Sequence, residues 1–304
     1  MIQTIDSTKE SICFSRTYAY GDIILTSAFL ENVKIKYPHL EILLHTDPYM
    51  IPLFLCCPTF KTTAEKQDGM IILNNIFEVM EDKEIAETGR LSKNRIELIC
   101  RYFDIPMVIR KPQYYLTSEE NESAFGKLAS MFPIPHIGIA PSSKQIEKTL
   151  GLPKWKTIIQ SLLQKTQGTI FIFDSSENES RLGITDKRVV YLGNMAWRGK
   201  MLYCLMVDVM VTHDSLWSHL AASTGTPQIL LTSCTDGKLL TKDYPSAFVI
   251  EPVEKCYPCF YRLEHNNCGR NTTPKCFDNL NIQDLVKYII QISEGNYESW
   301  SKEH

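Results

Sequence analysis

The sequence has no long apolar run and no recognisable leader. No stretch approaches the roughly 20 consecutive apolar residues of a transmembrane helix, so we expect no membrane span. The first ten residues, MIQTIDSTKE, have neither the basic start nor the apolar core of a signal peptide. We therefore expect a cytoplasmic protein.

An excess of charge of either sign is also lacking. The chain carries 32 basic and 35 acidic residues, spread evenly, for a net charge of −3. This balance does not indicate a polyanion-binding or lipid-binding surface, so nucleic acid is not supported as a partner. Internal repeats and low-complexity segments are absent too, and we expect no repeat architecture.

What the sequence does have is length, apolar content and a regular alternation of strands and helices. Its 304 residues, 44% of them apolar, suffice for two domains of about 150 residues, with a single-domain barrel as the competing interpretation. The break Phe132-Pro133-Ile134-Pro135 suggests domains over 1–132 and 133–304.

The first half opens as a strand, helix and strand of the parallel α/β kind. We predict strands at Ser11–Ser15 and Glu41–His45, with a helix from Asp22 to Lys36 between them. Gly21 and Asp22 then lie at the carboxyl end of the first strand, the edge of a parallel sheet where ligands gather. Asp22 could act there as a general base. The alternative is an ordinary helix N-cap.

The second half repeats this alternation. We predict strands at His136–Ala140, Thr169–Phe173 and Val189–Leu192, and helices at Trp155–Lys165 and Trp197–Val207. The loop after the first of these strands carries adjacent hydroxyls and lysines that could cradle a phosphate, namely Ser142, Ser143, Lys144 and Lys148.

The stretch 207–231 forms the central unit of this half, with a strand, a turn at Asp214, a helix and a second buried strand. Asp214 lies where an N-cap belongs, which leaves the backbone N–H groups of Ser215 and Leu216 to receive an anion such as a diphosphate. Ser215 and His219 share one helix face and would point toward that anion. The alternative is an ordinary capped helix with a solvent-facing histidine.

Two motifs together resemble the ADP-heptose heptosyltransferases of glycosyltransferase family nine. One is Arg16-x-x-x-x-Gly21-Asp22, and the other is Asp214-Ser215-x-x-x-His219 followed by a helix end at Gly-Thr-Pro. The resemblance implies a GT-B fold, in which two Rossmann-like domains face each other across a cleft with Asp22 and Asp214 on opposite walls. It further implies an ADP-linked sugar held by the C-terminal domain, inversion at the anomeric carbon and no metal for catalysis.

The same resemblance suggests roles for further residues. Asn194 and Met195 fall where the family binds the nucleotide base, and Lys148 matches the family's diphosphate-binding lysine better than Lys144 or Lys154. The chain has Leu216 where the family usually has glycine. It also has an alanine in the first helix where proline is usual, a change of backbone shape that leaves the chemistry untouched.

These roles define a mechanism and its alternatives. Asp22 would take the proton of an acceptor hydroxyl on a glycan, while Lys148, the Ser142-Ser143 turn and the helix after Asp214 would stabilise the departing diphosphate. The same donor chemistry could instead serve a protein serine or a modified nucleic-acid hydroxyl. An alternative of another class is a nucleotide-sugar-binding module without turnover.

Four of the ten cysteines gather in a segment with little apolar periodicity that precedes a C-terminal helix. Cys256, Cys259, Cys268 and Cys276 fall within 21 residues and open with the spacing C-x-x-C. Such spacing is typical of a structural thiolate site for zinc, with iron as the alternative ion. Reduced thiols or disulfides are the other interpretations. The autotransporter heptosyltransferases, one branch of the family resembled, bind iron with similar cysteines.

Overall fold

The computed structural model describes residues 4–260 and 274–296. The chain divides into two compact units, residues 1–117 with 239–243 and residues 118–238 with 244–304. Each unit contains one sheet of parallel strands, so the predicted α/β class is confirmed. None of the described helices combines the length and the apolar character that crossing a membrane requires.

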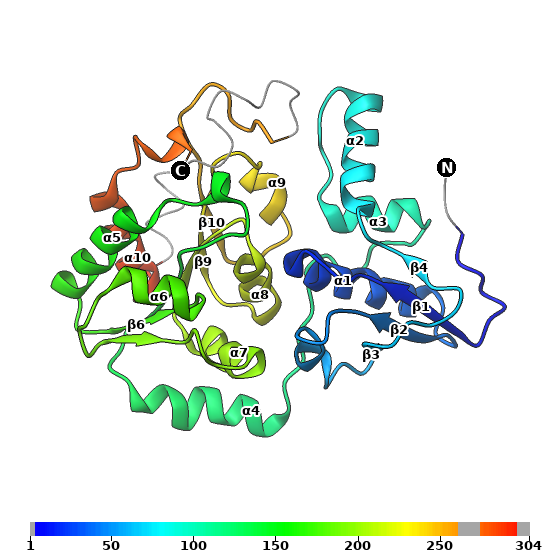
Figure 1. Cartoon of the computed structure of the whole chain (residues 1–304), viewed down its shortest axis with the longest axis horizontal. Helices are drawn as coiled ribbons and strands as arrows, with labels where there is room; N and C mark the ends of the chain where they lie inside the picture. Colours follow the sequence, from blue (N-terminus) through cyan, green and yellow to red (C-terminus); the bar gives the residue numbers. More distant parts are fainter. Residues whose placement is uncertain (1–3, 261–273, 297–304) are drawn as a thin grey trace. The chain divides into compact units, whose positions relative to one another are not determined.

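The first unit begins with the strand, helix and strand that the sequence predicts (Figure 1). Its sheet has the strand order β3-β2-β1-β4. In chain order its elements are β1 (Ser11–Ser15), α1 (Tyr20–Lys36), β2 (Glu41–His45), the 3-10 helix η1 (Ile51–Phe54), β3 (Lys61–Thr63), β4 (Ile71–Ile72), α2 (Ile76–Thr88) and α3 (Arg95–Tyr102).

The core of this unit fixes where β1 ends. β1 and β2 pair along their whole length, with Ser15 opposite His45. The Phe14 ring of β1 lies 5.3 Å from the Phe29 ring of α1 and 6.1 Å from the Phe103 ring at the end of α3, measured between ring centroids. Because these rings are buried, the strand stays anchored up to the loop that leads into α1.

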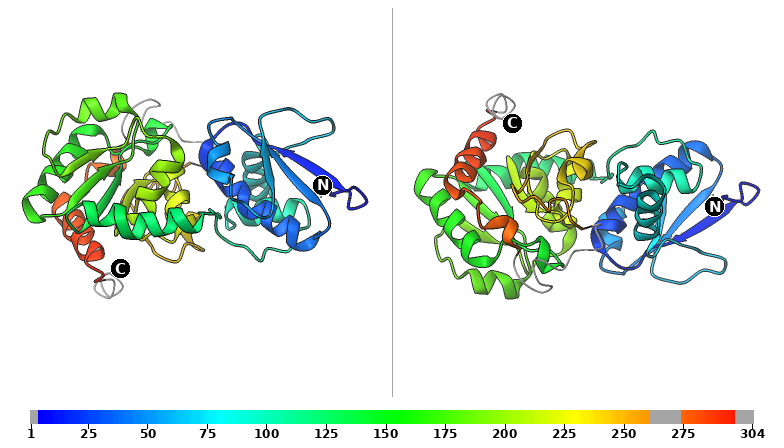
Figure 2. Two further views of the ribbon diagram at one scale, coloured as in Figure 1. Left: turned by 90° about the horizontal axis from the view of Figure 1, so that it is seen from below. Right: turned by 90° about the horizontal axis from the view of Figure 1, so that it is seen from above.

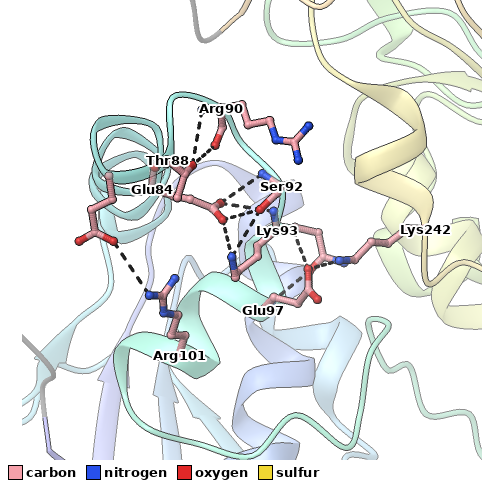
Figure 3. Close-up of polar contacts among 10 residues, drawn as sticks. Glu84, Thr88, Arg90, Ser92, Lys93, Glu97, Arg101 and Lys242 are labelled. Carbon is pink, nitrogen blue, oxygen red and sulfur yellow. Dashed lines mark hydrogen bonds and ion pairs between the residues drawn. The ribbon is translucent and has the colours of Figure 1, made fainter.

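One buried carboxylate fixes the turn between α2 and α3 (Figure 3). Glu84 of α2 accepts hydrogen bonds from Ser92 Oγ at 2.8 Å and from Lys93 Nζ at 2.6 Å. The helix α3 then opens with a capping box formed by Asn94 and Glu97. Together these contacts determine which residue stands first in α3.

The second unit has a sheet with the order β10-β9-β8-β5-β6-β7. Its elements are α4 (Ser118–Glu122), which continues as a π-helical turn η2 (Ser123–Leu128) and a 3-10 turn η3 (Ala129–Met131), then β5 (His136–Ala140), η4 (Ile146–Lys148), α5 (Leu152–Lys165), β6 (Thr169–Ile172), α6 (Ser176–Leu182), β7 (Val189–Tyr191), α7 (Trp197–Met206), β8 (Val209–His213), α8 (Leu216–Thr224), β9 (Gln228–Leu231), β10 (Ala247–Ile250), the 3-10 helix η6 (Lys275–Phe277) and α10 (Ile282–Ser293). The short helix α9 (Gly237–Thr241) begins in this unit, and its residues from Leu239 onward belong to the first unit.

Alternate strand residues of this sheet belong to one core with α5 and α10. Ile139 and Val211 point into that core beside Trp155, Ile159 and Ile289. The red helix of Figure 2 is α10, which contacts α5 as well as β5 and β8. The helices α7 and α8 pack on each other and stand outside this core.

The boundary between the units lies earlier than the predicted break at residue 132. The helical segment from Ser118 to Met131 belongs to the second unit. Glu120 of this segment pairs with Arg198 of α7, and Ala124 is buried. The prolines after this segment therefore mark the entry into β5 and not the division between the units.

Candidate active site

Asp22 lies in the first turn of α1, at the carboxyl end of β1. The helix starts two residues earlier than predicted because Ala19, with a φ of 58°, turns the chain into it. The backbone N–H of Asp22 donates to the Ala19 carbonyl at 2.8 Å. Ala19 is the N-cap, so the alternative reading of Asp22 as an ordinary cap is wrong. Gly21 stands beside it, half-buried.

Two arginines hold the Asp22 carboxylate. Arg16 Nη2 donates to Oδ2, and Arg95 Nη1 donates to Oδ1 at 2.5 Å. Arg95 in turn reaches Glu81, with Nε 2.7 Å from Oε1 and Nη2 3.1 Å from Oε2. The side chains of Asp22 and Glu81 are only 5% and 4% exposed. Two cations and two carboxylates cancel in charge, which permits their burial as a group.

In the second unit, two loops leave neighbouring strands at the same edge of the sheet. β5 and β8 pair in parallel with Ala140 opposite Thr212, so the loops that follow these residues begin side by side. Ser143 Oγ of one loop donates to the backbone carbonyl of Asp214 in the other at 3.3 Å. The predicted phosphate loop and the predicted anion-binding helix start are thus brought together.

Lys148 lies at this junction. Its Nζ is 2.6 Å from Asp214 Oδ2, and both side chains are nearly buried, at 12% and 11% exposed. The ammonium also lies 4.8 Å from the centre of the Phe260 ring. The competing lysines lie elsewhere, because Lys144 is exposed and Lys154 donates to a backbone carbonyl of η6.

Ser215, and not Asp214, caps α8. Its Oγ accepts the backbone N–H of Trp217 at 3.3 Å, while Leu216 is the first helical residue. The predicted cap at Asp214 was wrong by one position. The first turn of α8 contains no acidic residue. The positive end of this helix dipole is therefore not neutralised by a carboxylate of its own first turn.

His219 is buried one turn further along α8. It is 4% exposed, and its Nδ1 lies 2.7 Å from Tyr244 Oη. The alternative interpretation of a solvent-facing histidine is therefore wrong.

His213, which was not predicted as a site residue, connects the end of β8 with the segments around Leu150 and Leu231. His213 Nε2 accepts the backbone N–H of Leu150 at 3.2 Å, and Nδ1 lies 3.4 Å from the Leu231 carbonyl. Because a carbonyl can only accept, the ring proton sits on Nδ1. Complete burial lowers the pKa of His213 to about 4, so the ring is neutral at pH 7. It ties the end of β8 to the segment that carries Lys148.

The hydroxyl of Ser142 points away from Asp214. It donates to Asp174 Oδ2 at 2.6 Å and accepts from Asn178 Nδ2 at 3.0 Å. Asp174 is also contacted by Lys200, whose Nζ donates to the Asp174 carbonyl at 3.3 Å and to the Gly193 carbonyl at 3.1 Å. This contact joins the Ser142 turn to the predicted base-binding loop.

A buried carboxylate lies against that loop. Burial raises the pKa of Glu179, while the neighbouring backbone groups of Gly193 and Leu192 act in the opposite direction. A side chain at Gly193 would meet Glu179 Oε2 at 2.3 Å, so glycine is required there. Asn194 is exposed, and the Met195 backbone N–H returns to the Leu192 carbonyl at 2.9 Å.

The structure describes three of the four predicted metal ligands, because Cys268 lies outside the described residues. Cys276 Sγ donates to the Ser233 carbonyl at 3.3 Å, and the Cys259 backbone N–H donates to the Cys234 carbonyl at 2.9 Å. Two of the predicted ligands thus contact neighbouring residues of the segment that follows β9. Within residues 4–260 and 274–296, no three metal-binding side chains form a complete site.

Comparison with known proteins adds a family match. The family model of glycosyltransferase family 9 (heptosyltransferase) matches residues 63–268, about two thirds of the chain. This match contains Lys148 and the start of α8, whereas Asp22 precedes it. No curated protein shows significant similarity to the chain.

Solved heptosyltransferase structures share the fold. E. coli ADP-heptose LPS heptosyltransferase II is 13% identical with a TM-score of 0.66, over 94% of this chain and 99% of that one. E. coli WaaC with ADP is 12% identical with a TM-score of 0.62, over 93% and 99%. The iron-containing dodecameric glycosyltransferase TibC of enterotoxigenic E. coli is 12% identical with a TM-score of 0.67, over 94% and 76%. This similarity confirms the predicted GT-B-like fold.

Proposed function

The chain belongs to glycosyltransferase family 9, and from this premise we propose that it transfers heptose from ADP-heptose to an acceptor hydroxyl with inversion at the anomeric carbon. In this proposal the second unit binds the nucleotide sugar and Asp22 of the first unit is the general base. The observation that carries it is the junction of Lys148, Asp214 and the start of α8, because it combines the features a diphosphate needs.

These features are charge, hydrogen-bond donors and a helix end. Lys148 supplies a positive charge that is nearly buried, so water screens it little. The backbone N–H groups of Ser215 and Leu216 open a helix whose first turn carries no acid. Without nucleotide the ammonium is paired with Asp214, and a diphosphate would bind next to that pair.

The transfer step follows from these positions. The acceptor hydroxyl gives its proton to the Asp22 carboxylate while its oxygen forms a bond to the anomeric carbon. The bond between that carbon and the diphosphate oxygen breaks, and its electron pair leaves with ADP. Lys148 and the N–H groups at the start of α8 stabilise the negative charge that develops on the diphosphate.

The experiment is a donor screen with the full chain. ADP-heptose, UDP-glucose and GDP-mannose are each incubated with the protein, and release of the nucleoside diphosphate is measured. Lipopolysaccharide core oligosaccharide and serine-containing peptides serve as acceptors, and mass spectrometry detects the added sugar. We expect turnover with ADP-heptose. Turnover with the UDP- or GDP-sugar alone would overturn the donor assignment, and nucleotide binding without any turnover would favour a binding module.

We also propose a structural zinc or iron ion held by Cys256, Cys259, Cys268 and Cys276. The support is the soft donor set and the shared anchoring of two of its members at Ser233 and Cys234. TibC is described as iron-containing. The ion would order the segment and would take no part in transfer, since four protein ligands leave no open position.

Elemental analysis of protein purified without added metal tests this site. We expect about one equivalent of zinc or iron per chain, retained in a Cys56→Ser control and lost in Cys256→Ser. Less than about 0.2 equivalents in the unmodified protein would rule the site out.

A further inference from the structure

The two arginines that hold Asp22 differ in their access to solvent. The side chain of Arg16 has no exposed surface, its Nη1 donates to the Leu73 carbonyl at 2.5 Å, and its guanidinium lies 5.2 Å from the centre of the Phe77 ring. The side chain of Arg95 is 20% exposed. Oxygen Oδ2 of Asp22 is therefore bound by a fully buried cation, and Oδ1 is bound by a cation whose side chain reaches the surface.

Arg95 is itself held in a fixed orientation. It is the first residue of α3, directly after the capping residue Asn94. Glu81 of α2 binds its Nε and Nη2 as a fork at 2.7 and 3.1 Å. This pairing leaves Nη1 directed at Asp22 Oδ1, 2.5 Å away. A planar guanidinium held on one edge by a buried carboxylate can orient a second carboxylate on its other edge.

We propose that Arg95 is a positioning residue for the transfer step. Anchored by Glu81, it orients Asp22 so that an acceptor hydroxyl meets the carboxylate on the Oδ1 side, and its charge stabilises the negative carboxylate before the proton arrives. This inference rests on the proposed role of Asp22 as general base. Arg95 keeps its own proton throughout the step.

The charges around the base determine what removing Arg95 does. Asp22 faces two cations, Arg16 from the loop after β1 and Arg95 from α3, and Glu81 from α2 faces Arg95. Without Arg95, Asp22 loses one of its two cationic partners, and the buried Glu81 loses the guanidinium that binds it. Protonation of a carboxylate then becomes easier, so the activity must fall off at a higher pH than in the wild type.

The test uses full-length protein as wild type, Arg95→Gln, Arg95→Lys and the control Arg101→Gln. Arg101 lies on the same helix, but its side chain is 55% exposed and it comes no closer than 4.0 Å to Glu87. ADP release from ADP-heptose, with water as the acceptor, is measured between about pH 3 and pH 9, a range that contains the acid limb expected for an aspartate base. The affinity for ADP and the melting temperature are measured alongside.

We expect Arg95→Gln to lower kcat by about 10- to 100-fold and to move the acid limb up by about one pH unit, with the ADP affinity unchanged. Arg95→Lys should keep the acid limb in place but recover only part of kcat, because an ammonium cannot bind both carboxylates as a fork. Arg101→Gln should match the wild type.

The proposal is overturned if Arg95→Gln keeps the wild-type kcat and acid limb, or if Arg101→Gln loses as much activity. Should Arg95→Gln fail to fold, the test rests on Arg95→Lys. A wild-type kcat in Arg95→Lys would show that a guanidinium binding both carboxylates is not needed, which contradicts the proposal. Asp22→Asn separates the two proposals. If it is inactive while Arg95→Gln is normal, only the positioning role fails, whereas an active Asp22→Asn removes the base assignment.

Discussion

The helices α1 and α8 both begin where a buried parallel strand ends, and their first turns differ in charge. α1 carries Asp22 in its first turn and has no side-chain cap, because Ala19 precedes it with a positive φ. α8 is capped by the hydroxyl of Ser215 and carries no acid in its first turn. The same strand-helix unit thus presents a carboxylate in one case and free helix-dipole charge in the other.

Under the proposed function, this difference would let one kind of fold element serve both substrates. At α1 the dipole and two arginines stabilise a carboxylate that belongs to the protein, and in the proposed mechanism this carboxylate receives the acceptor proton. At α8 the negative partner would come from the ligand, with Lys148 already in place beside Asp214. In this proposal the residues of each first turn, more than the shared fold, determine which substrate is bound there.

The largest expected effect follows from removing the carboxylate at α1. Asp22→Asn should lower ADP release from ADP-heptose by about 10²- to 10⁴-fold, since the amide keeps the shape but cannot accept a proton. The rate is measured in a coupled ADP assay. The matched control is Asp104→Asn, because that carboxylate is exposed and pairs with the surface residue Lys36 at 3.4 Å. A rate within about threefold of the wild type would remove Asp22 from the mechanism.

The second prediction concerns the pH dependence of stability, part of which should come from His213, the last residue of β8 before the loop into α8. His213 stays neutral down to its pKa of about 4 in the folded protein, whereas the unfolded chain takes up that proton near 6.5. Between these values the unfolded state binds more protons, so stability falls as the pH falls. The loss amounts to at most about 3 kcal/mol, or roughly 10²-fold in the folding equilibrium.

Urea unfolding at pH 7 and near pH 4 measures this loss. His213→Gln takes up no proton, so its stability should fall less between the two pH values than that of the wild type. His39→Gln, at an exposed histidine, is the control. Equal losses in His213→Gln and the wild type would show that this histidine does not protonate on unfolding.

A third prediction removes the positive charge beside α8. Lys148→Ala should weaken ADP binding by about tenfold and lower turnover as well, because an ammonium beside a diphosphate acts in both the ground state and the transition state. Lys144→Ala, at an exposed lysine four residues earlier in the sequence, should bind ADP normally. If Lys144→Ala weakens binding and Lys148→Ala does not, the diphosphate contact belongs to the other lysine.

The smallest expected effect comes from making α8 resemble α1. Leu216→Asp places a carboxylate in the first turn and should weaken ADP binding by about fivefold, the size of a charge at a helix end. Leu216→Asn has nearly the same shape without the charge and serves as the control. Titration of both variants with ADP gives the comparison. Equal affinities would mean that the helix start does not contact the diphosphate.

Much of this fold could be predicted from the sequence because buried parallel strands leave apolar runs. The strands at Ser11–Ser15, Glu41–His45 and His136–Ala140 have the predicted bounds. Helix starts were less predictable, since a single backbone angle at Ala19 moved the start of α1 by two residues. The cap of α8 shifted from Asp214 to Ser215 because either side chain is a suitable cap.

The candidate site was predictable in its donor part and much less so in its acceptor part. Lys148 and Asp214 follow the carboxyl ends of two neighbouring strands, β5 and β8. The alternation of strands and helices in the sequence predicts both strand ends. Arg95 and Glu81 lie in helices far from Asp22 in sequence, and nothing in a single chain indicates that they meet. Only the packing of α2 on α3 brings their charges together.

Calorimetric titration of ADP into Asp22→Asn and Lys148→Ala, side by side with the wild type, tests most directly whether the two helix starts have separate tasks. The account predicts that Asp22→Asn binds ADP within about twofold of the wild type although its turnover is lost, while Lys148→Ala binds about tenfold more weakly. Weakened ADP binding in Asp22→Asn, or unchanged binding in Lys148→Ala, would contradict it.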